Sequence, residues 1–150
     1  ALVERYVAAA RERLPGRAVF AKLTPNAGDL APLARAAEAG GAHAVTAINT
    51  VLGLDVDTAR RRFVFDRVTA GLSGPAILPV ALCAVWQAAR AVSIPVIGAG
   101  GIASVDDALK FFMAGAAAVQ VGTGIFADPD LPARIVGALR ANGVPAAIDG

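Results

Sequence analysis

The sequence predicts an α/β fold, a (β/α)8 TIM barrel of which this chain supplies about the C-terminal four βα units. Four short apolar segments alternate with stretches of helical character, and this alternation is typical of a parallel sheet covered by helices. Right-handed crossovers leave two arrangements open, a barrel and an open doubly wound sheet. We favour the barrel because the unusual residues follow the strands, where barrels carry their chemistry. A closed barrel needs eight units in about 250 residues, so residues 1–150 are expected to be the C-terminal half of a single domain.

The first two units have clear boundaries. The first strand is expected at 18–23, and its helix follows Asp29, a good N-cap, and stops at Gly40 and Gly41. The second strand is expected at 43–48. A long interval, 49–75, then precedes the next helix at 76–91, and we expect a small extra hairpin around 62–65 within it.

The last two units each place a glycine-rich turn directly after a strand. The third strand is expected at 95–98 and leads to a helix opened by Ser104, with Asp107 three residues on in a capping-box arrangement. The fourth strand, 117–121, leads to a helix that ends near Asn142 and Gly143. Glycines let backbone N–H groups approach phosphate oxygens, and a helix N-terminus adds favourable charge, so the two turns predict a phosphate site.

Composition and charge narrow the class of protein. The chain is 56% hydrophobic and 17% charged, which excludes disorder, and its formal net charge of +2 gives no basic face for nucleic acid. Glycines and prolines interrupt the longest uncharged interval, 68–89, so we expect no membrane span. The single cysteine excludes an internal disulfide, which fits a reducing compartment, and we expect a cytoplasmic protein. No cluster of His, Cys and carboxylates has metal-ligand spacing, and we expect no metal. We expect Cys83 to be buried as packing in an apolar helix, and His43, before its strand, to lie away from the chemistry.

Five motifs in order resemble one family, the dihydroorotate dehydrogenases, and most closely the catalytic subunit of the class 1B, NAD-linked enzymes. The resemblance covers about residues 19–142. The motifs are Lys22-Leu-Thr-Pro-Asn26, Ile48-Asn-Thr-Val-Leu-Gly53, Gly71-Leu-Ser-Gly-Pro-Ala-Ile77, Ile94-Pro-Val-Ile-Gly-Ala-Gly-Gly-Ile102 and Val121-Gly-Thr-Gly124.

The resemblance implies an FMN-binding barrel that oxidises dihydroorotate to orotate in pyrimidine biosynthesis, with hydride passing from substrate C6 to flavin N5. It implies that the substrate contacts are Asn49 and Thr50. The Asn49 amide, with a donor and an acceptor, suits the alternating C=O and N–H edge of a dihydropyrimidine ring. It assigns cofactor contacts to Lys22, Ile48, Gly74, Gly100, Gly101, Gly122 and Thr123.

The resemblance also places part of the enzyme outside this sequence. The catalytic base of class 1 enzymes is a cysteine on a loop of the first half of the barrel, so we expect it upstream of Ala1 and assign no catalytic residue in this chain. The start lacks Met and any signal-like pattern, and we expect it to lie within a longer protein. The chain by itself is then expected to be inactive. Class 1B enzymes pass electrons to a partner subunit that carries FAD and a 2Fe-2S cluster, so a homo- or hetero-oligomer is implied.

Two alternatives stay open. The first is a flavin barrel like that of dihydropyrimidine dehydrogenase, which shares the strand-end glycines and the Gly-Leu-Ser-Gly run at 71–74. The second is a non-catalytic half-barrel that folds only by pairing, because its sheet would expose two edges. Activity with uracil and NADPH separates the first from our assignment, and a clean monomer in solution contradicts the second.

Overall fold

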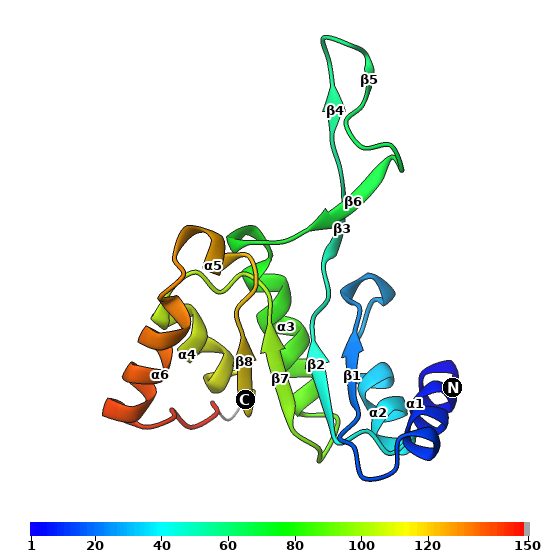
Figure 1. Ribbon diagram of the computed structural model, residues 1–150, viewed down its shortest axis with the longest axis vertical. Coiled ribbons are helices and arrows are strands. Elements are labelled where there is room, and N and C mark those ends of the chain that lie inside the picture. Colours follow the sequence, from blue (N-terminus) through cyan, green and yellow to red (C-terminus); the bar gives the residue numbers. More distant parts are fainter. Residues whose placement is uncertain (149–150) are drawn as a thin grey trace.

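A four-stranded parallel sheet forms the centre of the molecule (Figure 1). The computed structural model describes residues 1–148, so the last two residues of the expected domain lie outside the described part. Sheet neighbours follow chain order, β1-β2-β7-β8. The four predicted strands are confirmed. Three are two residues shorter than expected, and the third in chain order runs one residue later at both ends: β1 (Phe20–Leu23), β2 (Ala44–Ala47), β7 (Val96–Ala99) and β8 (Ala118–Gln120).

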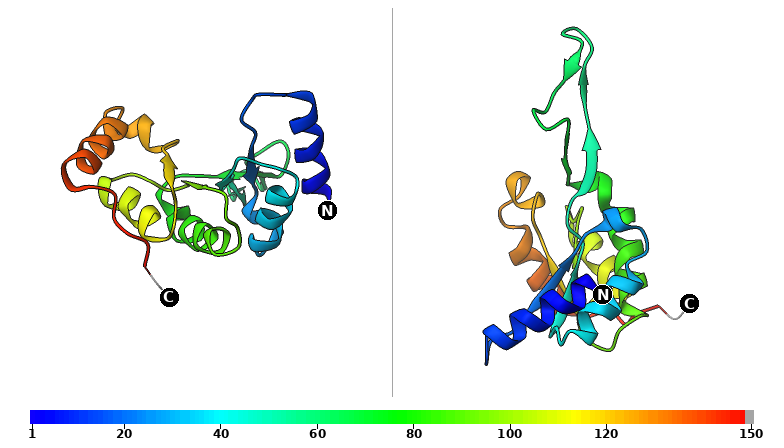
Figure 2. Two further views of the ribbon diagram at one scale, coloured as in Figure 1. Left: turned by 90° about the horizontal axis from the view of Figure 1, so that it is seen from below. Right: turned by 90° about the vertical axis from the view of Figure 1, so that its right-hand side faces the viewer.

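Helices cover one face of this sheet (Figure 2). Three of them lie directly on the strands, while the first and last pack against α2 and α4 at the two sides. The helices are α1 (Leu2–Arg13), α2 (Ala31–Ala39), α3 (Leu78–Ala89), α4 (Val105–Met113), the short α5 (Gly124–Ala127) and α6 (Leu131–Asn142), with 3-10 turns η1 (Pro25–Ala27) and η2 (Pro75–Ile77).

The two faces of the sheet differ in burial at the edge strand β1, whereas the central strand β2 is buried on both faces. Side chains toward the helices, such as Leu23, Val45 and Val96, are at most 4% exposed, whereas Phe20 on the other face is 55% exposed. A doubly wound sheet carries helices on both faces and reverses its strand order, so the described residues do not have that arrangement. They do not form a closed barrel either, because the sheet is open at β1 and β8.

One close contact fixes the distance between sheet and helix. Gly98 lies in β7 directly beneath Phe111 of α4, whose side chain is fully buried. A methyl group at Gly98 would overlap the Phe111 ring. The absence of a side chain therefore lets α4 lie close to the strand that carries the first glycine turn.

The interval 51–72 projects from the sheet as a long arm (Figure 1). The expected hairpin near 62–65 is confirmed at 62–63, and a second antiparallel pair precedes it at the base of the arm. The base pair is β3 (Val51–Leu54) with β6 (Thr69–Leu72), and the outer pair is β4 (Val56–Asp57) with β5 (Arg62–Phe63). Arg60 near the tip makes an ion pair with Asp57 at 2.8 Å.

Three local expectations need correction. Cys83 is exposed, because it lies on the outer side of α3 between the positions that pack on the sheet, so the prediction of burial was wrong. Asp29 is not the residue that caps α2. Leu30 holds that position, and the Asp29 carboxylate accepts a hydrogen bond from Ala31 N at 3.0 Å. The N-terminal helix α1 was not predicted at all.

No helix in the described range is both long and apolar enough to cross a bilayer.

Candidate functional site

A cavity of about 300 Å³ lies at the carboxyl ends of the strands. This volume is at the lower end of the range for small-molecule sites. All nine residues to which the family resemblance gives a cofactor or substrate contact line it: Lys22, Ile48, Asn49, Thr50, Gly74, Gly100, Gly101, Gly122 and Thr123. The five motifs are up to about 100 residues apart in the chain, and the fold brings them to one place.

The first glycine turn packs tightly against the start of α3. Gly101 has φ +80°, and a Cβ there would come within 2.6 Å of Leu78 N and 2.7 Å of Leu78 Cα. Both the conformation and the space therefore require glycine at this position. At Gly100 an added Cβ would lie 2.9 Å from Ala81 Cβ. This turn consequently has a structural reason for its glycines besides any ligand.

In the second glycine turn, Gly122 is different because it leaves open space, whereas an added Cβ at Gly124 would overlap Ile102 O. An added Cβ at Gly122 would meet no atom within 4 Å, and Gly122 does not have a positive φ. Among the described residues, none of the backbone hydrogen bonds formed in loops uses the N–H of Gly101, Gly122 or Thr123. Free amide donors beside an open cradle fit an anionic group such as a phosphate.

The Gly71 to Gly74 segment lies against Thr123 of the second glycine turn. Ser73 Oγ lies 2.8 Å from Thr123 Oγ1, so the two hydroxyls share a hydrogen bond across 50 residues of chain. Gly74 is buried with φ +90° and directly precedes η2. The Thr123 hydroxyl thus donates to Ser73 Oγ, and Ser73 supplies a second hydroxyl at the same place.

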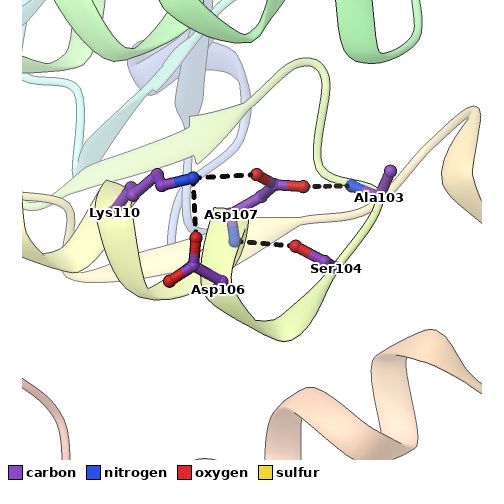
Figure 3. Close-up of polar contacts among 5 residues, drawn as sticks. All are labelled: Ala103, Ser104, Asp106, Asp107 and Lys110. Atoms are coloured by element: carbon purple, nitrogen blue, oxygen red, sulfur yellow. Dashed lines mark hydrogen bonds and ion pairs between the residues drawn. The ribbon is translucent and has the colours of Figure 1, made fainter.

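The helix after the first turn is anchored by its own first residues (Figure 3). Ser104 Oγ accepts a hydrogen bond from Asp107 N at 3.0 Å, as expected for an N-cap. The Asp107 carboxylate accepts from Ala103 N at 3.2 Å, one residue earlier than in the usual capping box. Partial burial raises the pKa of Asp107, but hydrogen bonds from Ser104 and Ala103 and the nearby Lys110 ammonium outweigh it, so its pKa lies below the usual value.

The helix after the second turn does not match the expectation of a favourable N-terminus. Only the four-residue α5 follows this turn, and the long helix α6 begins later, at Leu131. So short a helix contributes little dipole, because the macrodipole sums aligned peptide units. Amide groups of the turn itself are the remaining donors at Gly122 and Thr123.

The two residues that follow β2 form main-chain hydrogen bonds with the neighbouring strands on both sides. Ile48 N donates to Ala99 O at 2.8 Å, and Asn49 N donates to Leu23 O at 2.8 Å. Ile48 is buried, whereas Asn49 and Lys22 are exposed and line the cavity. Main-chain pairing therefore fixes the positions from which the polar side chains of Asn49 and Thr50 extend.

Two polar lining residues were not predicted. Ser73 lies inside the Gly-Leu-Ser-Gly motif, and its hydroxyl could have been noticed there. Gln120 is the last residue of β8, and a lone amide at the end of an apolar strand was the available signal. Both add hydrogen-bonding capacity to the cavity.

Acid and base groups are scarce here. Of the described residues that line the cavity, none carries a carboxylate, imidazole or thiol, and Lys22 is the charged one. His43 Nδ1 accepts a hydrogen bond from Val19 N at the amino end of the sheet, opposite the cavity, and Cys83 is on the outer side of α3. No group of three or more His, Cys, Asp or Glu within residues 1–148 is placed to hold a metal ion.

Comparison with known proteins decides the family. The family model described as dihydroorotate dehydrogenase matches residues 2–142. The chain belongs to the dihydroorotate dehydrogenase family. The match includes the arm and every strand-end motif.

Three relatives of the dihydroorotate dehydrogenase family show how much of the chain is shared. All three are named dihydroorotate dehydrogenase B (NAD(+)), catalytic subunit. That of Trichlorobacter lovleyi is 54% identical over 123 residues, which is 82% of this chain and 40% of the relative. That of Solidesulfovibrio magneticus is 52% identical over 127 residues, 85% of this chain and 42% of the relative. That of Bacteroides fragilis is 49% identical over 120 residues, 80% of this chain and 40% of the relative. The chain thus spans about two fifths of the length of these relatives.

Proposed function

We propose that this chain forms the phosphate end and part of the substrate end of the FMN site of a dihydroorotate dehydrogenase, which oxidises dihydroorotate to orotate in pyrimidine biosynthesis. The convergence of nine residues from five separate motifs on one cavity carries this proposal. We also propose that the open sheet is part of a (β/α)8 barrel. Strand neighbours in chain order, helices on one face and a cavity at the carboxyl ends all support that architecture.

The cavity residues fit FMN. The free amides of Gly101, Gly122 and Thr123 would bind its phosphate, and the remaining contacts would come from Lys22, Ile48, Gly74 and Gly100. When bound, FMN supplies a hydride acceptor for substrate C6. The Lys22 ammonium stabilises negative charge at this edge of the sheet, and the described residues that line the cavity place no carboxylate against it.

The proposed substrate contacts are polar side chains that line the cavity. Asn49 offers both an amide donor and a carbonyl acceptor to a dihydropyrimidine ring, and Thr50 adds a hydroxyl. A base that removes the C5 proton needs a group with a usable pKa near the substrate. The described cavity supplies none, so we assign this role to a cysteine upstream of Ala1, as the resemblance implies.

The relatives are named catalytic subunits, and this name supports a partner subunit. We propose such a partner for the full-length protein, with the FAD and 2Fe-2S centres that the family resemblance implies. The present chain contributes the FMN side of that transfer.

The experiment uses the purified full-length protein. Bound flavin is identified by its absorbance and mass, and anaerobic addition of dihydroorotate is expected to bleach the oxidised flavin band. Uracil with NADPH is the competing substrate pair. A protein without FMN, or one whose flavin responds to uracil with NADPH and not to dihydroorotate, contradicts the proposal.

A further inference from the structure

Just after β2 ends, the side chain of Asn26 makes the hydrogen bonds to the backbone that a neighbouring strand would otherwise make. The last ladder-type bond in this region runs from Asn49 N to Leu23 O. Beyond it, Asn26 Oδ1 accepts from Leu52 N at 2.8 Å, and Asn26 Nδ2 donates to Thr50 O at 3.1 Å. The amide therefore binds the chain on both sides of Val51, as a neighbouring strand would.

Asn26 is itself held in place. Its Nδ2 also donates to Thr24 Oγ1 at 3.0 Å, and its backbone N–H donates to the same oxygen at 3.3 Å. Thr24 caps η1, the short turn that directly follows β1 and Lys22. The orientation of the Asn26 amide is consequently fixed relative to the end of β1.

Thr50 is constrained from a second direction. Its side chain packs on Gly71 of β6, where an added Cβ would overlap Thr50 Oγ1. With its carbonyl bound by Asn26 and its side chain packed on Gly71, Thr50 has little freedom. Asn49 directly precedes Thr50, and its own N–H donates to the Leu23 carbonyl. The main chain is therefore held at both residues.

We propose that Asn26 is a positioning residue, which holds Asn49 and Thr50 at a fixed distance from Lys22 and so sets the affinity for the dihydropyrimidine ligand. The inference rests on the proposed function. Asn26 does not line the cavity, so it acts through the two residues that do. Cofactor binding depends mainly on the glycine turns on the other side of the cavity and is expected to be unaffected.

The test compares two affinities in the full-length protein. FMN affinity is measured by flavin fluorescence, and orotate affinity is measured by the change that orotate causes in the flavin absorbance. Asn26→Ala is expected to weaken orotate binding tenfold or more, because two hydrogen bonds that order the contact residues are lost. FMN affinity is expected to stay within twofold. Asn142→Ala is the matched control, since that amide also donates to a backbone carbonyl, Ala138 O at 3.1 Å, but lies at the end of α6.

A double-mutant cycle distinguishes positioning from general loosening. If Asn26 acts through Asn49, the Asn26→Ala change has a much smaller effect on orotate binding in an Asn49→Ala background. Thr24→Val is a milder second variant, and it is expected to weaken orotate binding several-fold because it removes the acceptor that orients the Asn26 amide.

Several outcomes overturn the inference. They are unchanged orotate affinity in Asn26→Ala, parallel loss of FMN and orotate binding, or additive effects in the cycle. A wild-type protein that binds neither FMN nor orotate overturns the proposed function and this inference with it. A wild-type protein that binds both, with a variant that also binds both normally, overturns this inference alone.

Discussion

Gly122→Val separates the phosphate assignment from the stability of the fold. Gly122 lines the cavity, yet an added Cβ would meet no atom within 4 Å and the backbone φ is not positive. The free energy of unfolding is therefore expected to change by less than about 0.5 kcal/mol. A branched side chain is instead expected to hinder a phosphate from reaching the free amides of Gly122 and Thr123, which line the same cavity.

The expected loss of FMN affinity follows from those amides. A hydrogen bond to a charged group contributes about 1.5–3 kcal/mol, so losing one such bond to the phosphate raises the FMN dissociation constant roughly 10- to 150-fold. Steric exclusion of the phosphate adds to this loss. Riboflavin, which has no phosphate, is expected to bind wild type and variant with similar affinity.

The assay is fluorescence titration of the full-length apoprotein with FMN and with riboflavin. Gly137→Ala is the matched control, because a Cβ at Gly137 also meets no atom within 4 Å but lies within α6, outside the cavity. This control is expected to bind FMN normally and to gain up to about 1 kcal/mol of stability from better helix propensity. An unchanged FMN dissociation constant in Gly122→Val would refute the phosphate assignment of the second turn.

Four further predictions concern stability and are checked by chemical denaturation of the full-length protein. Gly98→Ala is expected to cost about 1–3 kcal/mol because the new methyl group overlaps the Phe111 ring; a loss below about 0.5 kcal/mol would show that α4 can shift freely. Ser104→Ala is expected to cost about 1 kcal/mol by removing the N-cap of α4. Because folding lowers the pKa of Asp107, its stabilising contribution is complete above its usual value of 3.8 and is lost as the pH falls through the lower folded value. Asp107→Asn should flatten the part of the stability profile that lies below pH 3.8. Leu54→Ser, on the exposed arm, is expected to change stability by less than about 0.5 kcal/mol, and a larger loss would mean that the arm is packed in solution.

The alternation of strands and helices could be predicted because hydrophobic period and glycine punctuation are local signals. The strand-end positions of Lys22, Asn49 and Gly100 followed from that alternation, and they lie together at the cavity. The arm was only partly foreseen, since β3 and β6 pair across 14 intervening residues and neither has a strong signal by itself.

Side-chain roles that depend on distant partners could not be predicted. Cys83 lies in an apolar run, and only the angle at which α3 meets the sheet decides that it faces outward. Asn26 looks like an ordinary turn residue until β3 passes beside it. Ser73 and Thr123 are 50 residues apart, so no local pattern links their hydroxyls.

The packing of Gly98 beneath Phe111 has a consequence for divergence within the family. Either residue alone is hard to replace, because a side chain at Gly98 needs room that the Phe111 ring fills, and a smaller residue at Phe111 leaves a void above the glycine. Neutral drift at the two positions should therefore be correlated: homologues with a larger residue in the strand should carry a smaller one in the helix. At this contact, substitutions in β7 and α4 are therefore expected to occur together, even in relatives whose cavities differ.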